Sequence, residues 1–198
     1  MKIIEEYKSQ NKQSLEAYHR AEKVLPSGNT RSALYWNPYP LCMRSGKGNK
    51  ITDIDSNTRT DLNYNNTTLI LGHNHPKPIK AAKAQMGNGL VLGAATETEP
   101  LLAEELLNRL NAEKIRFTPS GTEAIMQALR VARAKTGKPL IAKCIGAYHG
   151  SWDAVPMMPS QHGIPEGVEE NTVYFPYNNT EAAEETIKQH RDRLARLS

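Results

Sequence analysis

The spacing of apolar residues changes from helical to alternating within the first third of the chain. Apolar side chains at helical intervals predict a helix over residues 5–25, which the sequence Pro26-Ser27-Gly28 ends. Short alternating runs, separated by turn signals, come next, at residues 41–44, 51–54 and 60–64. The first two runs and the glycine-containing turn between them predict a β-hairpin. Residues 1–70 are therefore expected to form an N-terminal segment, a helix followed by a small antiparallel sheet.

From residue 71 on, long segments with helical spacing of apolar residues alternate with short apolar runs. Helices are expected at residues 76–86, 100–110, 121–135 and 180–194. Strands are expected at residues 114–118, 140–145 and 172–175. Helices alternating with strands indicate βαβ units on a mostly parallel sheet, so the fold class is α/β. Because no strand follows the last helix, we expect residues 71–198 to be the first part of a larger domain whose sheet is incomplete.

The charges of the chain are nearly balanced and spread along its length. There are 25 basic and 21 acidic residues, a net charge of +4, and a solvated helix face explains the basic segment 190–196. A nucleic-acid partner usually requires a concentrated basic surface, so none is expected. No apolar run approaches the roughly 18 residues that cross a bilayer, and the polar start does not resemble a signal peptide. Two cysteines are too few for a disulfide framework, so we expect a cytoplasmic protein without a membrane partner.

One segment combines the end of a strand, a tight turn and the start of a helix. It reads Phe117-Thr118-Pro119-Ser120-Gly121-Thr122-Glu123-Ala124. A helix N-terminus presents unpaired N–H groups and a partial positive charge, which together bind phosphate. Gly121 allows close approach of an anion, and the hydroxyls of Ser120 and Thr122 add donors. The alternative is that Ser120 and Glu123 form a capping box, which needs no ligand.

An aromatic loop follows the next expected strand and reads Gly146-Ala147-Tyr148-His149-Gly150. In an open α/β sheet, ligands bind at the carboxyl ends of the strands, where both segments lie. A tyrosine ring beside an anion site suits a planar, phosphorylated ring. The alternatives are a half-buried tyrosine at the rim for Tyr148 and a hydrogen bond within the loop for His149.

Other residues with reactive or metal-binding side chains have simpler explanations. His73 and His75 lie on one side of an extended backbone, but a zinc site requires a third ligand and usually a fourth. A helix-entry turn held by histidine hydrogen bonds explains them better, so no metal is expected. Cys144 is likewise interpreted as a buried strand residue rather than a nucleophile.

In this order and spacing, the motifs resemble those of the class-III aminotransferases, fold-type-I enzymes that depend on pyridoxal 5'-phosphate. The resemblance rests on three groups of residues, namely Ser120-Gly121-Thr122-Glu123-Ala124, the pair Arg130 and Arg133 with Thr136-Gly137, and Tyr148-His149-Gly150. It extends over roughly residues 20–190, through three further motifs, namely Gly46-x-Gly48, Asp53-x-Asp55 and Gly72-His73-x-His75-Pro76. The fold that the resemblance implies is the N-terminal part of such an enzyme.

The resemblance also implies which residues bind the cofactor. Ser120, Gly121 and Thr122 would cradle the phosphate of pyridoxal 5'-phosphate. Tyr148 would stack on the pyridine ring, with His149 beside it.

Substrate binding is implied for Arg31, in Pro26-x-Gly28-Asn29-Thr30-Arg31. The segment is similar to that of the branch acting on β-amino acids, where the matching arginine grips the substrate carboxylate. A surface arginine is the alternative. The partners that the resemblance implies are amino acids and keto acids, together with a second copy of the full-length protein in a homodimer.

Some positions depart from the family pattern. Ile145 stands where the aminomutases of the family have an acidic residue, and Ser151 where they commonly have histidine, which favours a transaminase. The lysine that forms the Schiff base and the aspartate that pairs with the pyridine nitrogen are expected beyond residue 198, and Lys143 does not match that lysine.

We therefore expect amino-group transfer by the full-length protein and no activity of this chain alone. The alternatives are a glutamate-1-semialdehyde 2,1-aminomutase and a non-catalytic fragment that only binds cofactor or a partner.

Overall fold

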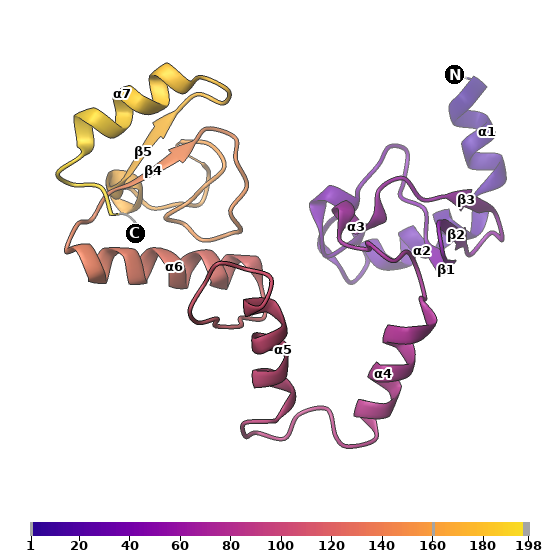
Figure 1. The fold of residues 1–198 in the computed structure, drawn as a ribbon. Coiled ribbons are helices and arrows are strands. Elements are labelled where there is room, and N and C mark those ends of the chain that lie inside the picture. Colours follow the sequence, from indigo (N-terminus) through magenta and orange to yellow (C-terminus); the bar gives the residue numbers. More distant parts are fainter. Residues whose placement is uncertain (1, 160, 196–198) are drawn as a thin grey trace. The chain divides into compact units, whose positions relative to one another are not determined.

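The structure of the protein, a computed structural model, describes residues 2–159 and 161–195. The chain divides into two compact units, one up to Ala95 and one from Thr96 on, which are described separately (Figure 1). The expected domain boundary after residue 70 stays a prediction. Among the described residues, no helix combines the length and the apolar character that a membrane span requires.

The first unit begins with two helices, α1 (Lys2–Gln10) and α2 (Lys12–Glu22), where the apolar spacing predicts one. The single helix expected over residues 5–25 is therefore wrong at Asn11, which has φ −130° and ψ 45°, and at its end, because α2 stops at Glu22. Asn11 is buried, its side-chain amide donates to Tyr7 O at 2.6 Å, and its Oδ1 accepts from Asn57 and Arg59. Hydrogen bonds to residues far along the chain thus interrupt the helix.

Asp55, which lies in the turn between the second and third strands of this unit, caps the first turn of α2. Asp55 accepts hydrogen bonds from Gln13 N at 2.7 Å, from Ser14 N at 2.9 Å and from the Ser14 hydroxyl at 2.7 Å. Burial alone would raise the pKa of the Asp55 carboxyl, but the hydrogen bonds from Ser14 and Gln13 outweigh it and hold the pKa below its ordinary value. The negative charge also faces the positive end of the helix dipole.

This cap makes the stability of the first unit depend on pH. We expect the free energy of unfolding to fall as the pH drops below about 4, the ordinary pKa of an aspartate. The folded-state pKa of Asp55 is lowered, so its stabilisation is present above the unfolded-state pKa and is lost as the pH falls through the folded-state pKa. Urea unfolding of the purified protein between about pH 3 and 6 measures this slope. The slope should be shallower in Asp55→Asn, and an unchanged slope in that variant would contradict the cap.

Three short antiparallel strands follow, β1 (Met43–Lys47), β2 (Lys50–Asp53) and β3 (Thr58–Thr60). In their register Gly46 pairs with Ile51, and Ile51 pairs with Arg59. The expected hairpin is confirmed, with Gly48 and Asn49 between its strands. Two 3-10 helices precede the sheet, η1 (Pro26–Gly28) and η2 (Ser32–Leu34).

The strand expected over residues 60–64 is wrong, because β3 ends at Thr60 and the short helix α3 (Tyr64–Thr67) follows. Asp61 ends the strand, since its Oδ1 accepts from Asn63 N at 2.9 Å and from Tyr64 N at 3.0 Å. The helix α4 (Pro76–Met86) has the predicted bounds.

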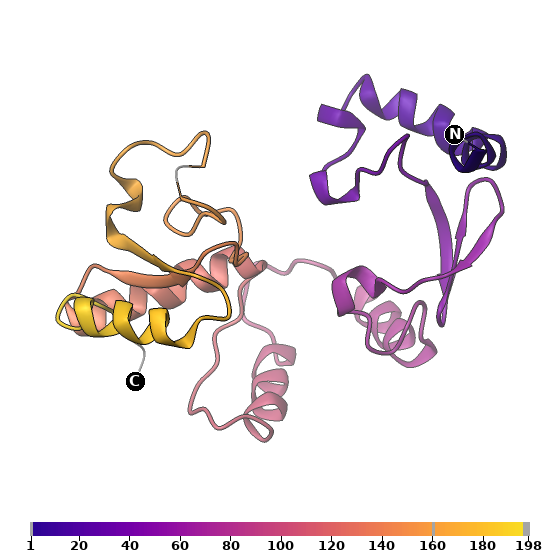
Figure 2. The same ribbon diagram turned by 90° about the horizontal axis from the view of Figure 1, so that it is seen from above.

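The second unit places a pair of parallel strands between two helices (Figures 1 and 2). Its elements are α5 (Thr98–Leu107), α6 (Gly121–Thr136), β4 (Ile141–Cys144), η3 (Val168–Asn171), β5 (Thr172–Phe175) and α7 (Thr180–His190). The strands β4 and β5 lie between α6 and α7, and Ala132, Leu140 and Ile141 are buried there. The α/β class and the parallel pairing are confirmed.

Three expectations for the second unit are corrected. The helix expected over residues 100–110 begins at Thr98 and ends at Leu107. The strand expected over residues 114–118 is wrong, because that segment is a loop that pairs with no strand among the described residues. The last helix ends at His190 instead of Leu194, and Leu194 forms a parallel bridge with Leu140. Of the basic segment 190–196, Arg196 lies outside the described residues.

Candidate functional site

The corner at the start of α6 is formed by a capped helix N-terminus. Ser120 is extended, and its Oγ accepts from Glu123 N at 3.2 Å and donates to Glu123 Oε2 at 2.7 Å. The N-cap bond of the alternative capping box is therefore present, but the Glu123 carboxylate bonds to the Ser120 hydroxyl instead of the Ser120 N–H. Within the described part of the chain, the N–H groups of Gly121 and Thr122 have no acceptor, as expected for a first helical turn. The corner thus keeps the N–H groups of Gly121 and Thr122 available, while the Ser120 hydroxyl caps the helix.

The aromatic loop begins with a tight turn after β4. Ala147 N donates to Cys144 O at 3.3 Å, and Gly146 has φ +78°, the signature of a type II turn. Gly146 N also donates to Met157 O at 2.7 Å. Tyr148, directly after the turn, is 69% exposed. Its ring is therefore open to a planar ligand.

The loop and the helix corner meet at Thr122. Ser151 N donates to Thr122 Oγ1 at 3.2 Å. Gly150 has φ +95°, and a β-carbon at this position would lie 2.7 Å from Thr122 Cα and closer still to its hydroxyl. Only glycine allows the backbone to pass this close to the helix. The structure thus brings together Thr122 and the loop that carries Tyr148 and His149, two segments that the sequence analysis chose separately.

A cavity of about 210 Å³ lies beside the aromatic loop. Its lining includes Tyr148, Ser151, Trp152, Met157 and His162. A larger cavity, of about 690 Å³, lies in the first unit and is lined by Tyr18, Trp36, Leu41 and other residues, but by none of the predicted site residues.

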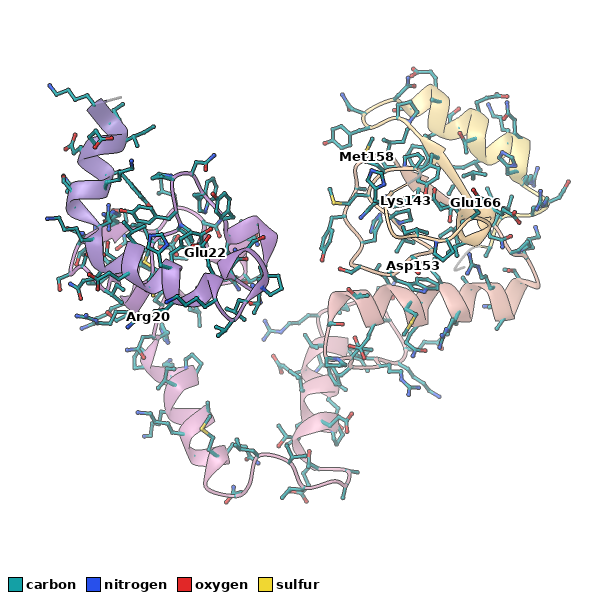
Figure 3. All side chains as sticks on the ribbon, turned by 180° about the vertical axis from the view of Figure 1, so that it is seen from behind. Arg20, Glu22, Lys143, Asp153, Met158 and Glu166 are labelled. Carbon is teal, nitrogen blue, oxygen red and sulfur yellow. The ribbon has the colours of Figure 1, made fainter. Side chains whose placement is uncertain are left out.

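Lys143 lies in β4, inside the second unit (Figure 3). It is buried, and burial lowers the pKa of its ammonium group. Its Nζ donates to Cys144 O at 3.1 Å and to Ala147 O at 2.7 Å, within the turn that precedes Tyr148. The sequence analysis excluded Lys143 as the Schiff-base lysine but missed this contact. The signal that could have revealed this contact is a lysine within the otherwise apolar run 140–145.

Arg31, the predicted substrate residue, belongs to the first unit and is exposed. Its backbone N–H donates to Asn29 Oδ1 at 2.9 Å. Among the described residues no hydrogen bond or ion pair involves its guanidinium group. Its role with a substrate stays a prediction.

Of the two histidines, His75 makes the hydrogen bond expected of a helix-entry turn, whereas His73 contacts an aspartate earlier in the chain. His73 Nε2 lies 2.7 Å from Asp61 Oδ2, and His75 Nδ1 accepts from Lys77 N at 3.4 Å at the start of α4. The His73 contact and two backbone N–H groups hold the pKa of Asp61 below its ordinary value. The sequence analysis missed Asp61, because it lies 12 residues from its partner.

Comparison with known proteins agrees with the motifs. The sequence profile named "Aminotransferase class-III" matches residues 33–197. A glutamate-1-semialdehyde 2,1-aminomutase of Methanopyrus kandleri is 37% identical over 193 residues, which are 92% of this chain and 45% of that protein. The chain therefore spans about half the length of the curated relatives that it matches.

Solved structures give the same picture. A structure described as "Transaminase with PLP bound" is 44% identical, with a TM-score of 0.88 over 93% of this chain and 46% of that one. An omega-transaminase from Sphaerobacter thermophilus is 40% identical, with a TM-score of 0.86 over 92% of this chain and 45% of that one. The match over residues 33–197 shows that the chain belongs to the class-III aminotransferase family.

Proposed function

We propose that the full-length protein transfers amino groups with pyridoxal 5'-phosphate and that this chain carries the phosphate-binding corner. The contact of the aromatic loop with Thr122 is the observation that carries the proposal. It joins an anion site and an aromatic face in one small region. Pyridoxal phosphate, when bound, supplies the electron sink that amino transfer requires.

The residues of the corner fit a phosphate group. The N–H groups of Gly121 and Thr122 and the Thr122 hydroxyl supply donors at the positive end of α6. Apart from its chain neighbours and the backbone of its own helix, nothing in the described part of the chain lies within 4 Å of where a β-carbon of Gly121 would stand, so the approach is open. Ser120 would add its hydroxyl once it releases Glu123.

Tyr148 and His149 would contact the ring of the cofactor. Tyr148 offers an exposed aromatic face, and His149 follows it in a loop that is fixed to α6 at Ser151. Aromatic pairs of this kind gain roughly 0.5–1.5 kcal/mol beyond the burial of their surface.

The substrate class that we propose is an amino-acid donor with a keto-acid or aldehyde acceptor, bound through Arg31. Two observations support a transaminase. Ile145 and Ser151 depart from the aminomutase pattern, and the two solved structures compared above, at 44% and 40% identity, are transaminases. The aminomutase is the second candidate, because the curated relative from Methanopyrus kandleri carries that name. Assays with α-, β- and γ-amino donors and with glutamate-1-semialdehyde separate the two.

We also propose a cytoplasmic homodimer for the full-length protein. Two cysteines are too few for a disulfide framework, which suits a reducing compartment. Several large apolar side chains are exposed in the first unit, among them Leu62, Ile70 and Val91. Such surface is typical of protein–protein interfaces. Sedimentation of the full-length protein tests the assembly.

Replacing Thr122 with alanine tests the phosphate site. Thr122→Ala should weaken the binding of pyridoxal phosphate about ten- to a hundredfold, because a hydrogen bond to a charged group contributes roughly 1.5–3 kcal/mol. Titration of protein fluorescence with the cofactor measures the affinity. Thr136→Ala, at the other end of α6, removes a hydroxyl that bonds to Ala132 O and should leave the affinity unchanged. Equal affinities of Thr122→Ala and the unmodified protein would contradict the site.

A further inference from the structure

A buried lysine occupies the strand that leads into the aromatic loop. Lys143 is 3% exposed, although lysine is almost never fully buried unless it is paired. Its ammonium group donates to two backbone carbonyls and lies 5.9 Å from the centroid of the Tyr174 ring. Within the described residues, no carboxylate forms an ion pair with it. Because burying a charge costs free energy, the two carbonyl contacts and the Tyr174 ring are what stabilises the ammonium here.

Both carbonyls belong to the same turn. Cys144 is the first residue of the type II turn and Ala147 the last, and the ammonium binds the oxygen of each, at 3.1 and 2.7 Å. The turn's own hydrogen bond, from Ala147 N to Cys144 O, is 3.3 Å long. Lys143 therefore adds two hydrogen bonds to the turn, and its own backbone is held in the sheet, where it pairs with Tyr174.

The turn is one of two anchors of the aromatic loop. At the far end of the loop, Ser151 N donates to Thr122 Oγ1, and Gly150 packs against Thr122. Tyr148 and His149 lie between the anchors. The place of the Tyr148 ring thus depends on the turn at one end and on α6 at the other.

We propose that Lys143 is a positioning residue for Tyr148. By holding the Cys144 and Ala147 carbonyls, it fixes the turn from which Tyr148 meets the cofactor ring. The inference rests on the proposed binding of pyridoxal phosphate. It also assigns the Lys143 amine to the turn, so Lys143 forms no covalent bond with the cofactor.

A double-mutant cycle tests the inference, with the dissociation constant of pyridoxal phosphate as the readout. Lys143→Met keeps the length of the side chain and removes its donors, and should weaken binding about tenfold. In a Tyr148→Ala background, Lys143→Met should hardly change the dissociation constant further. Lys143 acts on binding only through the Tyr148 ring, and that ring is absent from this background. A merely structural role would instead produce equal losses in both backgrounds, which would overturn the inference. Lys114→Met, at an exposed lysine of the same unit, is the matched control and should bind as the unmodified protein does.

A second variant keeps the test valid if Lys143→Met does not fold, which far-UV circular dichroism shows. Gly146→Ala strains the backbone of the same turn, because Gly146 has φ +78°. The added β-carbon meets no other described part of the protein within 4 Å, so the strain comes without a steric clash. It should weaken binding only when Tyr148 is present. Gly137→Ala imposes similar strain at the far end of α6, at φ +66°, and should not weaken binding. Equal affinities of Gly146→Ala and Gly137→Ala would overturn the inference.

The outcomes separate this inference from the proposed function. If the unmodified protein does not bind pyridoxal phosphate, the proposed function fails. If Thr122→Ala and Tyr148→Ala weaken binding but Lys143→Met does not, only the positioning role fails. Borohydride reduction of the protein with pyridoxal phosphate should leave Lys143 unmodified, as peptide mass spectrometry shows. A stoichiometric adduct on Lys143 would overturn the inference.

Discussion

Replacing Gly150 with alanine should weaken the binding of pyridoxal phosphate about a hundredfold, because it disturbs both the phosphate corner and the aromatic loop. A β-carbon at this position would stand 2.7 Å from Thr122 Cα, and a helix backbone does not yield to it. The loop must then leave α6, and the bond from Ser151 N to Thr122 Oγ1 is lost. In the Gly150→Ala variant, an alanine at the left-handed φ of +95° also strains the folded state by about 1–3 kcal/mol.

Two measurements separate these effects. A fluorescence titration gives the affinity for the cofactor, and thermal unfolding gives the stability. Gly167→Ala is the matched control, because Gly167 has φ +86° in the same unit but meets only ordinary contacts with Glu170. It should lower the stability to a similar extent and leave the affinity unchanged. An equal loss of affinity in Gly167→Ala would show that strain, and not the contact with Thr122, limits binding.

Replacing Asp53 with alanine should lower the free energy of unfolding of the first unit by about 2 kcal/mol, less than for a fully buried ion pair because the Arg59 side chain is 34% exposed. Asp53 is 0% exposed and accepts from Asn57 N at 2.8 Å, from the Asn57 amide at 3.3 Å and from the Arg59 guanidinium. Arg59 in turn donates to Asn11 Oδ1, at the break between α1 and α2. The change therefore loosens the sheet and the helices together. Urea unfolding followed by circular dichroism measures the loss.

A double-mutant cycle with Arg59→Met tests whether the ion pair is responsible. The two changes should be strongly non-additive, because either one breaks the same pair. Asp192→Ala, at an exposed aspartate of the second unit, should change the stability by less than about 0.5 kcal/mol. Additive losses from Asp53→Ala and Arg59→Met would contradict the assigned pairing.

The elements that could be predicted from the sequence are those with local signals. The helix α6 begins at the Ser120 cap and ends at Gly137, which has φ +66°, and both residues act on backbone groups within one turn of the helix. Pro76 marks the start of α4 in the same way. The hairpin and β5 follow from apolar runs bounded by turn residues. The candidate site residues were chosen from motifs that are short and continuous, and their roles stay predictions.

The tertiary structure decided what depends on partners far along the chain. Asn11 breaks the first helix because Asn57 and Arg59, 46 and 48 residues away, bind its side chain. Thr122 accepts a hydrogen bond from Ser151 N across 29 residues, which brings the two motifs together. Such contacts are encoded only by the packing of several elements at once, so no periodicity or spacing shows them. Lys143 depends on both local and distant contacts. The turn that it binds is four residues long and local, but its burial comes from the parallel pairing of β4 with β5.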